Sequence, residues 1–522
     1  MIDEVGGWEY RNPVIPGFHP DPSVCRVGDD YYLVTSSFEW FPGVPVFHSR
    51  DLVNWRQLGH VLDRPSQLDL DGVRPSGGVY AATIRHHDGL FYVVTTLVDG
   101  RGNFVVTAAD PAGPWSEPRW LPGTPGIDPS LLFDDDGRLW FTATREKKAA
   151  RYPGETEVYL LELDPATLEP RGEEHVIWEA VQRGAVWCEG PHLYKIGGRY
   201  YLLTSEGGTS YDHAVVVARA DHVTGPYVPN PRNPILTHRH LGLGHPIACT
   251  GHADLVETQN GEWWMVLLAT RPYGTPGDLG PGNLRGDNLG RETFLTRVHW
   301  EDGWPVAAQV EPVAVAPALP EHRWPAVPAC DHFDADRLSP VWNHLRTPRT
   351  PYWSLGDSRL RLRLRPETLA QRANPSLVVR RQQHMDFAVH AALDFLPGAG
   401  ECAGLALVQN DDHHVLLVRT ARGLELVRRK AGGDDLLASV RVPGHRRLYL
   451  GVEARGQAYQ ARYAVAAGEW IDLGDPVDGR ILSSAVAGGF TGAYVGMYAS
   501  SNGRPSSNVA AFDWFEYLPL GP

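Results

Sequence analysis

The chain has 522 residues, a formal net charge of −14 and 10% aromatic residues, including 17 tryptophans. This length suggests about two to four domains of roughly 100–200 residues each, and the aromatic content excludes a disordered chain. The acidic balance disfavours a nucleic-acid-binding surface, because phosphate contacts need clustered Lys and Arg. The 55 glycines and 43 prolines make up about 19% of the chain, whereas average proteins have about 12% Gly plus Pro. This excess favours a turn-rich β protein over a helix bundle.

The N-terminus and the cysteines narrow the class further. The first eight residues have neither a basic region nor an apolar core of a signal peptide, and no stretch approaches 18 apolar residues. We therefore expect a cytoplasmic protein without a membrane partner. The five cysteines are scattered and form no Cys-x-x-Cys pair, which predicts neither a disulfide framework nor a zinc site.

Five segments in the first 300 residues share a turn, a pair of large apolar or aromatic residues and a β-rich tail. The second residues of these pairs are Tyr32, Tyr92, Trp140, Tyr201 and Trp264, at intervals of 60, 48, 61 and 63 residues. Asp-Gly and Asn-Gly turns between apolar runs are typical of hairpins, and a second turn that opens with Asp follows in the first four units. Two hairpins per unit make a four-stranded sheet, so the repeat predicts a five-bladed β-propeller rather than a series of β-sandwiches.

Residues at one phase of this repeat should meet, because the first strand of every propeller blade lines the central channel. Eleven or twelve residues before the aligned aromatics lie Asp21, Tyr80 with Ala81, Asp128, Glu189 and His252. Carboxylates at the start of apolar strands are costly to desolvate, so three of them at one phase indicate a functional pocket. We expect Pro22 and Pro129 to hold the preceding Asp in an extended conformation.

Three acids around a pocket fit either a metal cage or acid/base chemistry on a neutral polar substrate. The spacing of an EF-hand is absent, and the run Asp134–Gly137 is better explained as a hairpin turn. One carboxylate per blade suits glycoside hydrolysis, which needs a protonated acid at the leaving oxygen and an ionised partner. Nearby aromatic residues could stack on a sugar, although each alone is more typical of a core: Phe38, Trp40, Phe41, Tyr80 and Trp187.

Several motifs resemble those of glycoside hydrolase family 43, in particular its two-domain β-xylosidases. They are Asn12–Tyr32, Ser37–Gly43, Cys188–Tyr194, Glu206–Thr209, Gly251–Asp254 and Leu289–Phe294. The resemblance implies a five-bladed propeller and an inverting mechanism. It also implies that Asp21 is the general base, that Glu189 is the general acid, and that Asp128 orients Glu189 and raises its pKa. The two carboxyl groups of an inverting pair should stand roughly 6.5–9.5 Å apart.

The same resemblance implies the residues that contact the sugar. Arg291 matches an arginine that binds sugar hydroxyls, and Phe38 and Thr209 match the lining of the sugar pocket. Tyr80 begins the sequence Tyr-Ala-Ala, where many relatives have Trp-Ala-Pro. Because this segment would form a wall of the sugar subsite, the preference for xylose or arabinose is left open. His252 matches an axial histidine near a bound cation or water. No cofactor is expected to be required. For His252, two roles are left open: a contact with a structural divalent cation such as calcium on the axis, or a hydrogen-bonded core histidine.

A proline-rich stretch predicts three parts: a propeller over 1–304, a linker over 305–329 and a second domain over 330–522. The linker holds six prolines in the 24 positions from Pro305 to Pro328, which is typical of an extended connection. From residue 330, alternating runs such as Arg359–Arg365 and His413–Arg419 predict an antiparallel β-sandwich, concanavalin A-like by the resemblance. The resemblance also implies that the loop Ser500–Ser507 leans over the propeller mouth. An independent carbohydrate-binding module is the alternative role for this domain.

Together these features predict an all-β, exo-acting, inverting glycosidase that releases xylose from the non-reducing ends of β-1,4-xylooligosaccharides. An α-L-arabinofuranosidase, or both activities in one pocket, stays open, with arabinoxylooligosaccharides as substrates. A retaining glycosidase and a non-catalytic sugar-binding propeller are less favoured hypotheses for the same pocket. Whether the chain forms a homo-oligomer is left open.

Overall fold

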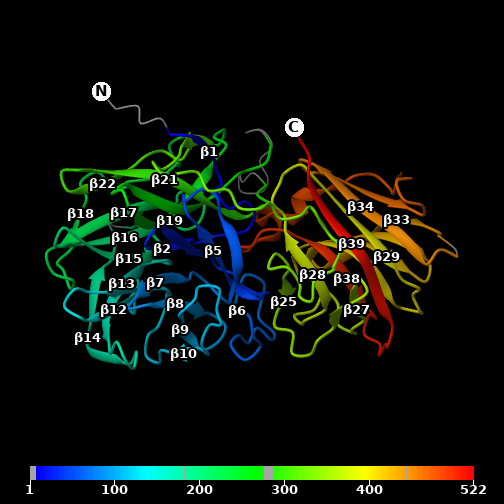
Figure 1. The fold of residues 1–522 in the computed structure, drawn as a ribbon, viewed down its shortest axis with the longest axis horizontal. Coiled ribbons are helices and arrows are strands. Elements are labelled where there is room, and N and C mark those ends of the chain that lie inside the picture. The colour runs from blue at the N-terminus through cyan, green and yellow to red at the C-terminus, as the bar shows by residue number, and fades with distance from the viewer. Residues whose placement is uncertain (1–6, 181–183, 275–285, 443, 522) are drawn as a thin grey trace.

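The structure is a computed structural model that describes residues 7–180, 184–274, 286–442 and 444–521. The N-terminal part, blue to green in Figure 1, forms a β-propeller, and the C-terminal part, yellow to red, forms a β-sandwich beside it. No helix in these described ranges is long and apolar enough to cross a bilayer.

The propeller consists of five four-stranded antiparallel sheets, whose strands follow one another along the chain except that β4 (Trp40–Phe41) lies between the second and third strands of the first sheet. They are β2 (Ser23–Val27), β3 (Asp30–Val34), β5 (Gly43–Ser49) and β6 (Arg56–Leu62); β7 (Thr83–His87), β8 (Leu90–Leu97), β9 (Gly102–Ala108) and β10 (Arg119–Trp120); β11 (Ile127–Phe133), β12 (Leu139–Glu146), β13 (Thr156–Leu163) and β14 (Pro170–Trp178); β15 (Glu189–Ile196), β16 (Arg199–Glu206), β17 (Ala214–Ala220) and β18 (Val228–Pro229); and β19 (Ala248–Glu257), β20 (Trp263–Thr270), β21 (Arg291–Glu301) and β22 (Trp304–Ala307). Every aligned aromatic of the sequence repeat lies in the second strand of a blade, and the predicted propeller is confirmed.

The inner strands of three blades are irregular at their N-terminal ends. Their pairing with the second strand shifts register after Ile127 in β11, after Glu189 in β15 and after Ala248 in β19. Such bulges bend a strand and re-aim its side chains, and they are common beside active sites. Two of the acids at the repeated sequence position, Asp128 and Glu189, therefore lie where the inner strands are irregular, whereas Asp21 precedes the regular strand β2.

A buried polar network on the axis joins all five blades. It takes at least one residue from each inner strand: Ser23 (β2), Arg85 (β7), Ser130 (β11), His192 and Tyr194 (β15) and Asp254 (β19). At its centre, Arg85 Nη1 lies 2.9 Å from Oδ2 of the fully buried Asp254. Burial opposes the ionisation of Asp254, but Arg85, His192 and Ser23 together outweigh burial and hold the pKa of that carboxyl below its ordinary value.

The proline-rich stretch lies along the propeller. Its strand β23 (Val313–Val315) pairs antiparallel with β1 (Glu9–Arg11), so the start of the chain and the stretch after β22 form a small sheet together. Further on, the backbone N–H of His322 donates to Asp51, and Trp324 Nε1 donates to the carbonyl of Asn54. These contacts fix the path of the chain before it enters the second domain.

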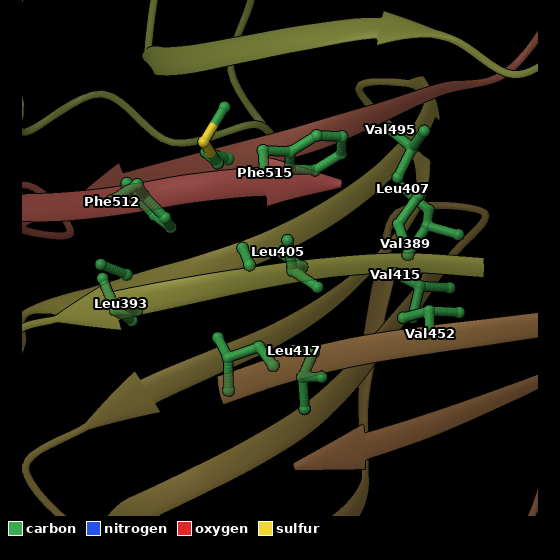
Figure 2. Close-up of a cluster of buried hydrophobic side chains, with 14 of the residues drawn as sticks. Val389, Leu393, Leu405, Leu407, Val415, Leu417, Val452, Val495, Phe512 and Phe515 are labelled. Carbon is green, nitrogen blue, oxygen red and sulfur yellow. The ribbon is translucent and has the colours of Figure 1, made fainter. Parts of the chain in front are cut away.

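The second domain packs two antiparallel sheets face to face. One has the order β26 (Trp353–Leu355), β27 (Leu360–Arg363), β39 (Val509–Pro519), β29 (Phe387–Asp394), β34 (Arg447–Arg455), β35 (Ala458–Ala464) and β36 (Ile471–Asp472), with β24 (Cys330–Asp331) on β39 and β37 (Val477–Asp478) on β35; the other has the order β28 (Ser376–Arg381), β38 (Tyr494–Ser500), β30 (Cys402–Asn410), β31 (His413–Thr420), β32 (Gly423–Lys430) and β33 (Gly433–Val440). Alternate residues of both sheets fill the space between them, as Figure 2 shows for Val389, Leu393, Leu405, Leu407, Val415, Leu417, Val452, Val495, Phe512 and Phe515. The predicted sandwich is confirmed.

The two domains share a sheet of their own. Strand β4 (Trp40–Phe41) of the propeller pairs antiparallel with β25 (His344–Leu345) of the sandwich. The ring of Trp40 stacks on Tyr494, with 3.7 Å between centroids, and both side chains are fully buried. This pairing brings the sandwich against the end of the propeller where the bulged strands begin.

Replacing Asp254 with Ala should lower the free energy of unfolding by about 3–5 kcal/mol, because Arg85 would be left buried without its counter-charge. Urea denaturation followed by circular dichroism measures the change. The control is Asp136→Ala, which removes an exposed partner of Arg138 and should cost less than about 0.5 kcal/mol. Equal effects of the two substitutions would contradict the role given to the axial pair.

Candidate active site

One small pocket brings together every residue that the sequence analysis assigned to a site. It is lined by Asp21, Phe38, Tyr80, Ala81, Ile127, Asp128, Glu189, Thr209, His252, Arg291 and Phe490. The cavity volume is about 80 Å³. The sequence repeat therefore predicted correctly that its equivalent positions, among them the three acids, meet in one place. The family resemblance supplied the pocket residues outside the repeat, which are Phe38, Thr209 and Arg291.

The backbone at several of these positions is in the left-handed region. The φ angles are 54° at Asp21, 51° at Phe38, 55° at Asp128 and 44° at His252. The expectation that proline would hold Asp21 and Asp128 extended was therefore wrong. At Asp128 the bulge at the start of the strand outweighs the local preference of a residue before proline. Non-glycine residues in this region cost roughly 1–3 kcal/mol each and cluster at active sites.

Asp21 is held as an ionised carboxylate. Its Oδ1 accepts a hydrogen bond from Arg291 Nη1 at 2.9 Å and lies 3.5 Å from His252 Nδ1, and its Oδ2 accepts one from Ser36 Oγ at 2.5 Å. Burial alone would raise the pKa of Asp21, but Arg291, His252 and Ser36 together outweigh burial and lower it. This carboxylate is therefore ready to accept a proton at neutral pH.

Glu189 has the opposite electrostatic environment. Burial is the largest cause that raises its pKa well above the ordinary value, and the negative charges of Asp128 and Asp21 raise it further. The pKa of Asp128 is also raised, again chiefly by burial. Asp128 is therefore the second cause of the shift at Glu189, after burial. The two carboxyls share one site and titrate as a pair.

Asp128 is also tied to the backbone beside Glu189. Its Oδ2 accepts a hydrogen bond from the N–H of Gly190 at 3.1 Å. Gly190 has a φ of 61°, and a Cβ at this position would lie 3.0 Å from Nε2 of His252. Position 190 therefore needs a glycine, because a side chain there would press on His252. Through its bond to Gly190, Asp128 fixes the strand that carries Glu189.

His252 serves as a partner of Asp21 in this arrangement. Its backbone N–H donates to Ser205 Oγ at 2.7 Å, and it faces His213, whose pKa is lowered to about 3 by burial and then by His252. Within the described ranges, no group of three or more His, Cys, Asp and Glu side chains is arranged to hold a metal ion. A divalent cation near His252 therefore stays a prediction.

Arg291 connects the carboxylate to the rest of the pocket wall. It is the first residue of β21, and its Nη1 also approaches Thr209 Oγ1 at 3.3 Å. Its guanidinium carbon lies 5.5 Å from the ring centroid of Phe38 and 5.9 Å from that of Phe490. Arg291 thus stabilises the charge of Asp21 and presents a cationic group between two aromatic rings.

Phe490 was missed by the sequence analysis. It belongs to the sandwich, and 41% of its surface is exposed at the pocket. The loop that reaches the pocket is therefore 488–491. The segment Ser500–Ser507, which was expected there, packs on its own domain, where Asn502 Nδ2 donates to Gly400 O and Ser506 Oγ donates to Glu401. In the sequence, only an aromatic residue within the glycine-rich run Gly488–Gly492 marks this position.

Comparisons with known proteins agree with this geometry. Residues 10–305 match the model of glycosyl hydrolases family 43, and residues 330–518 match that of the beta xylosidase C-terminal concanavalin A-like domain. A xylosidase/arabinosidase of Butyrivibrio fibrisolvens is 41% identical, over 97% of this chain and 98% of its own. A non-reducing end alpha-L-arabinofuranosidase of Bacteroides ovatus is 39% identical, over 98% and 95%. The crystal structure of a xylan beta-1,4-xylosidase from Bacillus halodurans superposes with a TM-score of 0.90 at 37% identity, over 98% and 100%.

Proposed function

Because this chain belongs to glycosyl hydrolase family 43 and is a glycosidase, we propose that it releases xylose from the non-reducing ends of β-1,4-xylooligosaccharides with inversion. The observation that carries the proposal is the opposite shift of two carboxyl groups in one pocket. The pKa of Glu189 is raised and that of Asp21 is lowered. Pairs of carboxyls whose environments separate their pKa values are typical of an acid and a base in one active site.

In the proposed reaction, Glu189 donates its proton to the glycosidic oxygen as the bond from that oxygen to the anomeric carbon breaks. Asp21 removes a proton from a water molecule, which attacks the anomeric carbon from the opposite face. The products are the shortened oligosaccharide and xylose of inverted configuration. This mechanism needs room for water between the carboxyl groups, hence the separation of roughly 6.5–9.5 Å, which stays a prediction.

The other pocket residues would bind and orient the sugar. Asp128 keeps Glu189 protonated through its charge and holds β15 through Gly190. Phe38, Tyr80 and Phe490 supply aromatic surface, with 5.1 Å between the ring centroids of Phe38 and Tyr80. Because Phe490 comes from the second domain and closes one side of the pocket, the arrangement suits the terminal sugar of a chain, in keeping with exo action.

The second candidate is α-L-arabinofuranosidase activity, alone or together with xylosidase activity. It is favoured by the names of two relatives that align over nearly the whole chain, a xylosidase/arabinosidase and an alpha-L-arabinofuranosidase. The rates of hydrolysis of an aryl β-xyloside and an aryl α-L-arabinofuranoside distinguish the two. A kcat/KM that is higher on the arabinofuranoside would reverse the order of preference.

Glu189→Gln should lower kcat on xylobiose by about 10²–10⁴-fold, because the amide cannot protonate the leaving oxygen. The loss should be smaller on a dinitrophenyl β-xyloside, whose leaving group needs little protonation. Glu174→Gln, at a surface partner of Arg145, is the control and should keep the wild-type rate. Wild-type hydrolysis of xylobiose by the Glu189 variant would exclude the proposed general acid.

The pH profile follows from the directions of the two shifts. Activity needs Asp21 ionised and Glu189 protonated, so the rate should fall below the lowered pKa of Asp21 and above the raised pKa of Glu189. Asp128→Asn removes one of the charges that raise the pKa of Glu189. The alkaline limb of kcat/KM on xylobiose should therefore move to lower pH in this variant. An unchanged alkaline limb would show that Asp128 does not act on Glu189 through its charge.

Proton NMR of the first product tests the stereochemistry. An inverting enzyme acting on an aryl β-xyloside, which releases only one xylose, gives α-xylose before mutarotation mixes the anomers. Early appearance of β-xylose would instead show retention and would assign a nucleophilic role to one of the carboxylates.

A further inference from the structure

A segment of the sandwich, residues 479–493, lies over the rim of the pocket and carries Phe490. It comprises the 3-10 helix η2 (Gly479–Leu482), the short helix α1 (Ser484–Ala487) and the loop before β38. The backbone of Phe490 is held on both sides by the propeller: its N–H donates to Ser76 Oγ at 2.8 Å, and its carbonyl accepts from Arg291 Nη2 at 3.3 Å. The position of Phe490 therefore depends on how this segment is docked.

The start of α1 is fastened to the propeller by the side chain of Asp287. Its Oδ1 accepts hydrogen bonds from the backbone N–H and the Oγ of Ser484 at 3.0 and 2.8 Å, and its Oδ2 lies 2.7 Å from the same Oγ. The carbonyl of Asp287 accepts from the N–H of Gly290 at 2.7 Å, which closes a turn directly before Arg291. One residue thus links α1 to the turn that places Arg291.

Close apolar packing does not hold this part of the interface. A cavity of about 80 Å³ lies between the two domains here, and Asp287, Ser484, Arg291 and Phe490 are among its lining residues. This cavity shares Thr209, Arg291 and Phe490 with the sugar pocket. Because a cavity forfeits dispersion contacts on its lining, directional hydrogen bonds must determine where α1 and Phe490 lie.

We propose that Asp287 is a positioning residue which fastens α1 to the propeller and thereby fixes Phe490 over the terminal sugar. The proposal rests on the proposed function, since it assigns to Phe490 a contact with the bound sugar. Asp287 itself lines the neighbouring cavity and acts through Ser484.

The ends of the segment have separate attachments through Asn288. Its Nδ2 donates to the carbonyl of Gly479 at 2.8 Å and to the hydroxyl of Tyr459 at 3.0 Å, and its carbonyl accepts from the N–H of Ala493 at 2.7 Å. Loss of the Asp287 side chain should therefore release the middle of the segment while both ends stay in place. The fold of the chain should survive the substitution.

The test compares Asp287→Ala with Asp287→Asn. The alanine variant should raise KM for xylobiose about tenfold with kcat within about twofold, because a lost hydrogen-bonded anchor weakens substrate binding without changing the acid and base. The asparagine variant keeps an acceptor oxygen for Ser484 and should restore KM to within about threefold of wild type. Burial raises the pKa of Asp287 to about 6, which indicates that a neutral side chain is tolerated at this position.

The matched control is Arg349→Ala, which breaks a different contact between the domains, the ion pair from Arg349 Nε to Asp71 Oδ2 at 3.0 Å. Asp71 and Arg349 line neither cavity, so KM should stay at the wild-type value. An unchanged KM in Asp287→Ala, equal defects in the Ala and Asn variants, or an equal rise in Arg349→Ala would each overturn the proposal.

Hydrogen exchange provides a readout that does not need turnover. Amides of residues 484–491 should exchange faster in Asp287→Ala than in wild type and Asp287→Asn, while those of β25 stay unchanged. Unchanged exchange in the segment would refute the fastening by Asp287. If wild-type protein fails to hydrolyse xylobiose while exchange responds as expected, the proposed function fails and the fastening stands.

Discussion

The buried pair of Arg85 and Asp254 on the axis is the contact on which the arrangement of the blades depends. An isolated charge in this position would be prohibitively costly, so the two side chains must meet, and Ser23, His192 and Tyr194 must satisfy their remaining hydrogen bonds. Since these residues come from inner strands, the strands are fixed relative to one another in depth and rotation. The bulges at their N-terminal ends then have a fixed relation too, and the carboxyl groups they carry are brought into one pocket.

The chemistry of that pocket follows from unequal partners around similar groups. Asp21 and Glu189 are both surrounded by protein, and burial alone would raise the pKa of each. Arg291 and His252 contact Asp21 and reverse the effect there. Glu189 instead has two carboxyls as its main charged neighbours, and Arg291 only moderates the shift. The partners that contact Asp21 thus move the pKa values of the two carboxyls in opposite directions.

The sequence could predict the blades and most of the pocket because both are periodic. Hairpin turns and the paired aromatics recur in register, so residues of one phase, such as Asp128 and Glu189, could be assigned to one place. The left-handed backbone at Asp21 and Asp128 could not be predicted from the Asp-Pro pair, since nonlocal constraints such as the register shift in β11 act there. Phe490 contacts Ser76 across 414 residues, and nothing in the local pattern around either residue indicates their contact.

The small sheet formed by β4 and β25 has a consequence for the modular use of this protein. Separating the domains would expose two strand edges and uncover the stacked rings of Trp40 and Tyr494, so we expect an isolated propeller to be less stable than the whole chain. A chimera that joins the propeller of one relative to the sandwich of another would need matching β4 and β25 strands. It would also need the sandwich loop that supplies Phe490. The substrate preference of such a chimera would then be a property of the pair of domains, inherited from neither parent alone.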